Sequence, residues 1–208
     1  MNLLVESDVP AEQCFLIARQ SKKLTHVLPW VFAVVGIGGG ALAIAEAVIP
    51  MAVMWTGLFA LFALSTSAMC RAERRPTNWL LAAAPDGVYA KFRSYLNWGI
   101  VGVDPTVVFV PWSEVAAVRV ELGQRLSLEL APGVDTRELA SALGAERERK
   151  GPRGHTWLQY PVSLGDGPPR LTLPWRTSYD HIVPSLDDTC EALRPRLGDA
   201  LGVRSDQQ

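Results

Sequence analysis

The chain has 208 residues and a formal net charge of −1 at pH 7, with acidic and basic residues spread evenly outside one apolar stretch. A nucleic-acid-binding protein needs a basic face that displaces counterions, and the sequence contains no such concentration of lysine and arginine. The three cysteines are far apart, so their spacing predicts neither a disulfide framework nor a zinc site. We therefore expect no nucleic-acid partner and no bound metal.

Residues 1–26 precede the apolar stretch and are expected to form a short cytosolic segment. The opening sequence MNLLVESDVPAEQ is acidic, and it lacks the basic region that begins a cleavable signal peptide. Lys22 and Lys23 lie near the end of this segment, directly before the apolar residues.

Residues 27–70 form an apolar stretch whose only charged residue is Glu46. A single helix of this length would be about twice as long as the hydrocarbon core of a bilayer is thick. Pro50 offers a natural break and divides the stretch into 27–49 and 51–70, each close to the length of a membrane-spanning helix. The sequence therefore predicts an antiparallel transmembrane hairpin. Glu46 can then lie near the headgroups, with a buried functional carboxylate as the alternative.

The first half of the apolar stretch contains the sequence GIGGGA at 36–41, which matches the outline of a dinucleotide-binding turn. Such a turn needs an acidic residue about 20 residues further on, and Thr56 stands there instead. Small residues at helical spacing also let transmembrane helices approach closely, and we favour this interpretation. Whether the partner helix is the second span or another subunit is open. The packing residues predicted from the spacing are Gly36, Gly40, Ala43 and Ala47 in the first span, with Gly57, Ala60 and Ala63 in the second.

Positive charges flank the apolar stretch on both outer sides and are absent from the connecting turn. Because the cytoplasmic flanks of membrane helices carry an excess of lysine and arginine, we expect an integral inner-membrane protein with both termini in the cytoplasm. The same side chains are candidates for contact with anionic lipid headgroups, although setting the topology suffices to explain them. These candidates are Lys22, Lys23, Arg71, Arg74 and Arg75.

The sequence after Arg75 consists of short alternating apolar segments separated by turn residues, which predicts half-buried antiparallel strands. We expect seven strands, over 78–84, 88–94, 106–111, 115–122, 125–131, 156–164 and 170–175. Two helices are expected, over 136–150 with Asp135 as its cap and over 182–194 with Pro195 ending or kinking it. Residues 76–208 are thus predicted to form a mainly β cytosolic domain, a small bent sheet or barrel plugged by the C-terminal helix.

Two adjacent spans followed by such a domain resemble bacterial integral membrane proteins that bear a pleckstrin-homology-like domain. The resemblance covers roughly residues 20–195 and implies a membrane-anchored binding module; the segment 136–150 would be an insertion in it. The basic signature of a phosphoinositide site is not visible in the sequence, so no such site is carried over. The matching segments are Pro85-Asp86-Gly87 before Val88-Tyr89-Ala90, VVFVPWSEVAAVRV at 107–120 and RLTLPWR at 170–176.

The sequence contains no pattern typical of an active site. The histidines His26, His155 and His181 are isolated, and none of the motifs H-E-x-x-H, G-x-S-x-G and C-x-x-C occurs. We therefore expect a protein that is not an enzyme and uses no cofactor. A membrane-tethered enzyme, or an accessory subunit of a transport or envelope complex, is the alternative.

The loop 97–103 is apolar and rich in glycine at a place where a loop between strands is usually polar. An exposed apolar loop is typical of an interface, so Trp98, Ile100 and Val101 are candidates for contact with the bilayer or with a partner. A strand edge folded into the core explains the same residues equally well. The predicted function is binding or scaffolding at the cytoplasmic face, with the lipid bilayer and a protein partner or a second copy of the chain as partners.

Overall fold

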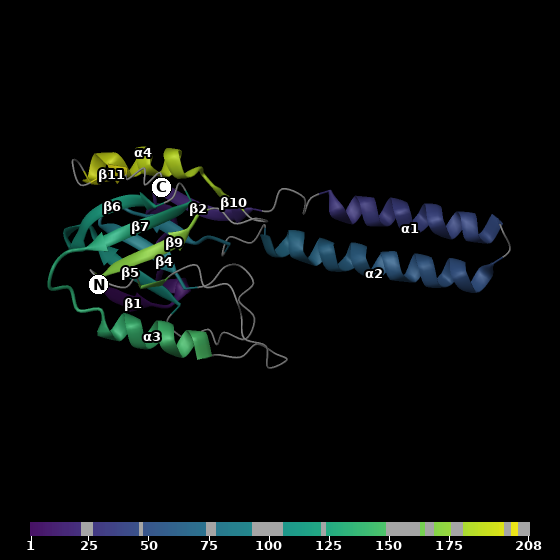
Figure 1. The fold of residues 1–208 in the computed structure, drawn as a ribbon, viewed down its shortest axis with the longest axis horizontal. Coiled ribbons are helices and arrows are strands. Elements are labelled where there is room, and N and C mark those ends of the chain that lie inside the picture. Colours follow the sequence, from purple (N-terminus) through teal and green to yellow (C-terminus); the bar gives the residue numbers. More distant parts are fainter. Residues whose placement is uncertain are drawn as a thin grey trace. The chain divides into compact units, whose positions relative to one another are not determined.

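The computed structural model of the chain divides into two units, which are described separately. One unit is Lys22–Arg75, and the other combines Met1–Ser21 with Pro76–Gln208. We call them the hairpin unit and the β unit (Figure 1). The residues that the structure describes are 1–21, 27–45, 48–73, 78–92, 106–121, 124–148, 163–164, 169–175, 181–197 and 201–203.

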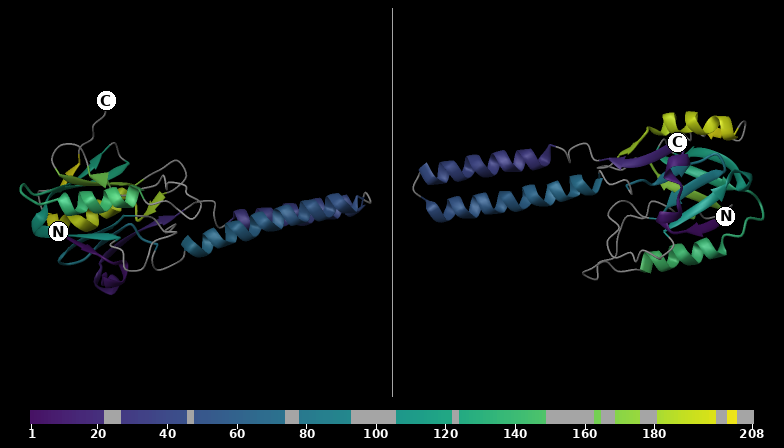
Figure 2. Two further views of the ribbon diagram at one scale, coloured as in Figure 1. Left: turned by 90° about the horizontal axis from the view of Figure 1, so that it is seen from below. Right: turned by 180° about the vertical axis from the view of Figure 1, so that it is seen from behind.

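The hairpin unit consists of the two helices α1 (Leu28–Ala45) and α2 (Ile49–Glu73), which lie side by side in every view (Figure 2). Both are long and apolar enough to cross a membrane. The break between them differs from the predicted one, because α1 ends at Ala45 and Pro50 lies in the first turn of α2. A proline is tolerated there because the first N–H groups of a helix have no intrahelical acceptor.

The strands of the β unit form two sheets rather than one bent sheet, and the described strands do not close into a barrel. The six-stranded sheet has the order β1 (Asn2–Leu4), β5 (Val107–Pro111), β4 (Gly87–Lys91), β3 (Leu81–Ala83), β2 (Leu16–Ser21) and β10 (His181–Val183). The five-stranded sheet has the order β11 (Leu201–Val203), β6 (Val115–Glu121), β7 (Arg125–Leu130), β9 (Arg170–Pro174) and β8 (Ser163–Leu164). Neighbouring strands are antiparallel except for β11 and β6.

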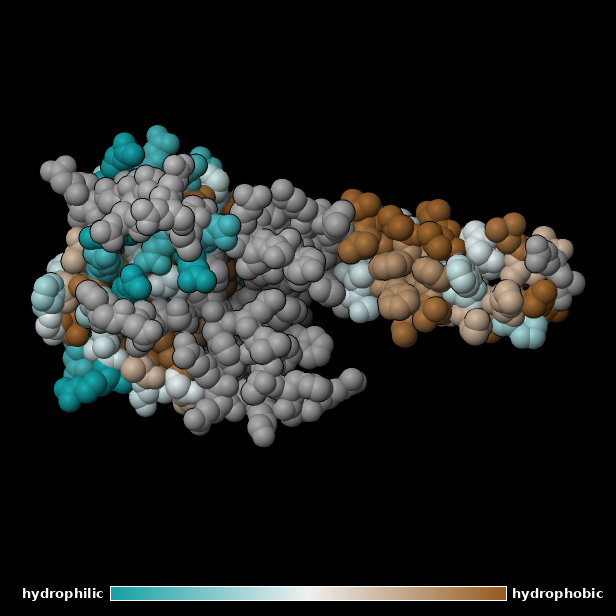
Figure 3. Space-filling model, in the orientation of Figure 1, coloured by the Kyte–Doolittle hydropathy of each residue, from teal (hydrophilic) through white to brown (hydrophobic). Residues whose placement is uncertain are grey.

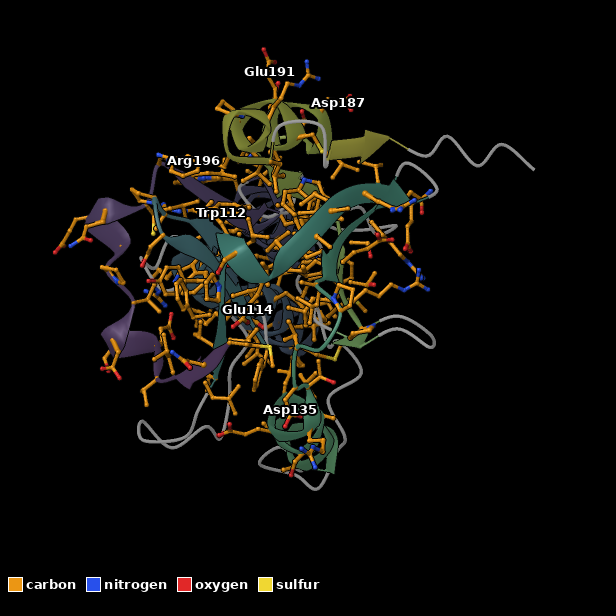
Figure 4. All side chains as sticks on the ribbon, turned by 90° about the vertical axis from the view of Figure 1, so that its left-hand side faces the viewer. Trp112, Glu114, Asp135, Asp187, Glu191 and Arg196 are labelled. Atoms are coloured by element: carbon orange, nitrogen blue, oxygen red, sulfur yellow. The ribbon has the colours of Figure 1, made fainter. Side chains whose placement is uncertain are left out.

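Among the described residues, three short 3-10 turns and two helices complete the β unit. The turns are η1 (Glu6–Asp8), η2 (Ala11–Gln13) and η3 (Trp112–Glu114). The helices α3 (Arg137–Glu148) and α4 (Leu186–Leu197) lie on opposite sides of the unit (Figures 1 and 4). Leu139 of α3 and Leu193 of α4 are fully buried in the main core with the inward leucines and valines of both sheets.

The N-terminal segment differs most from its predicted role, because residues 1–21 belong to the β unit instead of forming a separate segment. Asn2–Leu4 pairs with Val107–Phe109 of β5, and Leu16–Ala18 pairs with Leu81–Ala83 of β3. The side chain of Ala18 is fully buried. These pairings join residues far apart in the chain, and a local alternation pattern does not reveal such partners.

The C-terminal helix begins and ends later than predicted. Ile182 belongs to β10, and α4 begins after Ser185. The Ser185 hydroxyl accepts a hydrogen bond from the Asp188 N–H at 3.2 Å and donates one to the Asp188 carboxylate at 2.7 Å. This side-chain cap satisfies one of the backbone donors that the first helical turn leaves without acceptors. The helix continues through Pro195 to Leu197 instead of ending at Arg194.

Candidate functional site

The contact between α1 and α2 is built on three small residues of α1. Gly36, Gly40 and Ala43 are its buried residues. A Cβ atom placed on Gly36 would lie 2.7 Å from the Cβ of Phe59, closer than two carbon atoms can pack. A Cβ on Gly40 would collide with the hydroxyl oxygen of Thr56. The backbone of α1 therefore approaches α2 at Gly36 to a distance that only glycine permits, whereas an added Cβ at Gly40 would require the Thr56 hydroxyl to move.

The face that α2 presents to α1 differs from the predicted one. Gly57 and Ala60 are exposed, and a Cβ added to Gly57 would meet no atom within 4 Å. The α2 residues that meet the small residues of α1 are instead Thr56 and Phe59, and Ala52 is buried. The sequence pattern failed here because it matched small residues with small residues. In the structure, aromatic side chains of α2 fill the space that the glycines of α1 leave.

An aromatic cluster extends along this contact. The ring of Phe59 lies 4.9 Å from the ring of Trp55 and 6.2 Å from that of Phe32, between ring centroids, and the rings are tilted. The Trp55 indole Nε1–H donates a hydrogen bond of 3.2 Å to the backbone carbonyl of Val35 in α1. Dispersion between rings and a polar contact of this kind are the forces available to hold helices together in lipid.

On the face shown in Figure 3, the hairpin unit is mostly apolar. Among the described residues, all exposed large hydrophobic side chains except Phe15 and Val183 belong to this unit, including Ile37, Leu42 and Val53, each about 70% exposed. A helix pair in water needs a polar outer face, which these helices lack. An exposed apolar surface of this extent is typical of contact with lipid or with other apolar surfaces.

Only some of the remaining predicted hairpin and loop residues lie within the described part of the chain. Arg71 is exposed in the last turn of α2. Ala63 is half-buried and lines a groove between the helices. The candidates that lie outside the described residues are Ala47, Lys22, Lys23, Arg74, Arg75, Trp98, Ile100 and Val101.

The β unit contains a buried ion pair that sequence reasoning missed. The alternation in β4 places Tyr89 and Lys91 on the face opposite Val88 and Ala90, which predicts exposure to solvent. The structure instead buries the Lys91 side chain completely, where its ammonium forms an ion pair with the Glu6 carboxylate of η1. The ammonium also lies 5.2 Å from the centre of the Trp79 ring, within cation–π distance.

The N-terminal segment is what covers this face of the six-stranded sheet. Val9, Cys14 and Ile17 pack against the buried cluster that includes Trp79 and Tyr89. Burial lowers the pKa of the Lys91 ammonium, and the hydrogen bond and charge of Glu6 partly oppose that shift. The Lys91–Glu6 pair therefore fastens the N-terminal segment over β4 rather than forming an accessible catalytic group.

The described cysteines of the β unit do not have the character of nucleophiles. Burial raises the pKa of the Cys14 thiol, and the Asp86 carboxylate adds to the shift. Burial, with the Asp187 carboxylate, likewise raises the pKa of Cys190. A thiol whose pKa is raised stays protonated at neutral pH and is a poor nucleophile.

The acidic side chains labelled in Figure 4 lie on different parts of the β unit. Asp187 and Glu191 lie on α4, whereas Asp135 lies beside α3 at the opposite side of the unit. Hydrogen bonds from the Arg137 guanidinium, together with one from the Arg137 backbone N–H, hold the pKa of the Asp135 carboxyl at about 2. Within the described part of the chain, no group of three or more histidine, cysteine, aspartate or glutamate side chains could hold a metal ion.

Comparison of the chain with protein-family models, with curated proteins and with solved structures gives no match. The pleckstrin-homology-like resemblance therefore stays a prediction. The coarser description holds: two helices near the N-terminus are long and apolar enough to cross a membrane, and a region rich in β-sheet with a C-terminal helix follows them.

Proposed function

We propose that the chain is a non-enzymatic membrane protein whose hairpin unit anchors a pleckstrin-homology-like binding or scaffolding module at the cytoplasmic face of the inner membrane. The observation that carries this proposal is the outward direction of the large apolar side chains on α1 and α2. Exposing such side chains to water costs about 25 cal/mol for each Å² of apolar surface, and a bilayer removes that cost. The absence of charge between Val27 and Cys70, apart from Glu46, supports the same conclusion.

The charges that flank the hairpin support the cytoplasmic orientation. Basic residues precede α1 and follow α2 in the sequence, and the turn between the helices has none. With 25 residues at about 1.5 Å each, α2 is longer than the roughly 30 Å hydrocarbon core. Its final turn, with Arg71, can therefore extend into the headgroup region on the side where both flanks lie.

The arrangement of ionisable groups in the β unit supports binding over catalysis. In the described residues these groups are engaged in ion pairs with opposite charges, such as Arg119 with Glu129 at 2.6 Å and Arg170 with Glu121 at 3.0 Å. An anchored module gains a high effective concentration toward other components of the same surface. We therefore expect the β unit to engage a membrane-associated partner.

Affinity purification after crosslinking in native membranes tests this function. We expect one recurrent partner to be captured by the full chain and by a chimera in which an unrelated two-span hairpin replaces residues 22–75. The control is a chain with the native hairpin unit and an unrelated soluble domain. A partner that follows the native hairpin and not the β unit would contradict the proposal and favour an accessory subunit that docks through its membrane helices.

A further inference from the structure

A groove with a volume of about 420 Å³ lies between the two helices at the end of the hairpin where α1 begins and α2 ends. Its half-buried lining includes the small residues Ala33, Ala63 and Ser67. Two exposed side chains border it, Trp30 in the first turn of α1 and Arg71 in the last turn of α2. The aromatic cluster that fills the rest of the helix contact does not line this groove, so the small side chains leave it open.

The position of the groove along the helices places it at the edge of a bilayer, given the proposed membrane location on which this inference depends. The apolar span of α2 ends at Ser67, and Arg71 lies one turn beyond it. Tryptophan side chains favour the boundary between hydrocarbon and headgroups, and Trp30 is 74% exposed at that level. The groove therefore has one end in the hydrocarbon and the other among the headgroups.

The chemistry of the lining changes in the same direction. Ala33 and Ala63 offer an apolar surface toward the hydrocarbon side. Arg71 offers a planar guanidinium that suits phosphate oxygens, and the Ser67 hydroxyl can donate a further hydrogen bond. A basic pocket between membrane helices on the cytoplasmic side is a typical binding site for acidic lipid headgroups.

We propose that this groove binds one anionic phospholipid. Its phosphate lies at Arg71 and Ser67, and the beginning of one acyl chain packs on Ala33 and Ala63. A free phosphate ion would leave the apolar part of the groove empty. A zwitterionic lipid would bring its own cation next to Arg71, so the groove selects a lipid with net negative charge.

Native mass spectrometry of the full chain tests the proposal. The chain is released from detergent in the presence of either phosphatidylglycerol or phosphatidylcholine with the same acyl chains. We expect phosphatidylglycerol to be retained preferentially, and Arg71→Gln to lower its retention about fivefold, the factor that one basic side chain near the membrane surface supplies. Arg71→Lys keeps the charge but loses the planar guanidinium, so it is expected to lower retention less than Arg71→Gln does. The matched charge control is Arg125→Gln, which removes an exposed arginine of the β unit and is expected to change nothing.

A second pair of variants tests the groove without changing any charge. Ala63→Leu fills the groove and is expected to lower retention as Arg71→Gln does, whereas Ala60→Leu adds the same atoms at an exposed position of the same helix and should not. The proposal would be overturned if the two lipids were retained equally, or if inorganic phosphate displaced the lipid. It would also be overturned if Arg71→Gln behaved like Arg125→Gln, if Ala63→Leu behaved like Ala60→Leu, or if the chain formed a dimer that excludes lipid.

Failure of this proposal is distinguishable from failure of the membrane location. Every variant is expected to stay in the membrane fraction of cells. A chain that stays there but shows no preference for anionic lipid refutes the lipid site alone. A chain found in the aqueous fraction refutes both.

Discussion

Replacing Gly36 by alanine is expected to force the two helices of the hairpin apart, whereas the same replacement at Gly38 is expected to leave them in place. The new Cβ at position 36 would lie 2.7 Å from the Cβ of Phe59. A Cβ atom is fixed to its backbone, so no rotation of the Phe59 side chain relieves this collision. A Cβ at position 38 would meet no atom within 4 Å.

The expected loss of hairpin stability for Gly36→Ala is about 1–3 kcal/mol, the usual range for overpacking a close contact. The approach of the helices can be measured by disulfide formation between cysteines introduced at Ala43 and Ala52, which are both buried. Native Cys70 is replaced by serine in this assay. We expect a clearly lower yield for Gly36→Ala than for Gly38→Ala or Gly57→Ala. Equal yields in all three variants would show that the close contact at Gly36 does not hold the helices together.

Replacing Glu6 by glutamine is expected to loosen the N-terminal segment from β4. The exchange removes a negative charge beside the fully buried Lys91 ammonium. Removing one member of such a pair leaves a buried charge less well compensated, and we expect a cost of about 2 kcal/mol because Glu6 itself is partly exposed. Lys91→Met should cost less, since it removes the buried charge and leaves Glu6 access to water.

Peptide-resolved amide hydrogen exchange of the full chain in nanodiscs measures this effect at Asn2–Leu4 and Gly87–Lys91. We expect Glu6→Gln to speed exchange in both strands, and Lys91→Met to speed it less. Glu12→Gln is the matched control, because Glu12 is exposed in the next turn of the same segment. If Glu6→Gln and Glu12→Gln were indistinguishable, the ion pair would have no role in fastening the segment.

The alternation of apolar residues predicted the central strands of the β unit. Leu126, Leu128 and Leu130 recur at every second position of β7, and all three are buried in the main core. The predicted ranges contain β3, β5, β6, β7 and β9, and that for β4 lacks only Gly87. Of the predicted strand 156–164, only Ser163–Leu164 lies within the described residues and is a strand. The prediction succeeded because the signal is local. Successive side chains of a strand point to opposite faces of the sheet, so apolar residues recur at every second position on a face that lines the core.

What the sequence did not reveal depends on contacts between distant segments. Lys91 alternates with apolar neighbours and thus suggests an exposed side chain, but the N-terminal segment covers that face of the sheet. The packing face of α1 could be predicted from the sequence more readily than that of α2, because glycine at helical spacing has few roles other than close packing. For α2, small residues such as Gly57 and Ala60 occur on the exposed side, and the aromatic Phe59 forms the contact.

The membrane location of the hairpin with both chain ends in the cytoplasm is tested most directly by reporters fused to each terminus of the full chain. After an alkaline carbonate wash, we predict that the chain stays with the membranes. In a separate measurement on cells, a fluorescent protein that folds only in the cytoplasm should fluoresce at both termini. A phosphatase that is active only outside the cytoplasm should be inactive at both termini. Release of the chain by carbonate, or phosphatase activity at either end, would contradict the account.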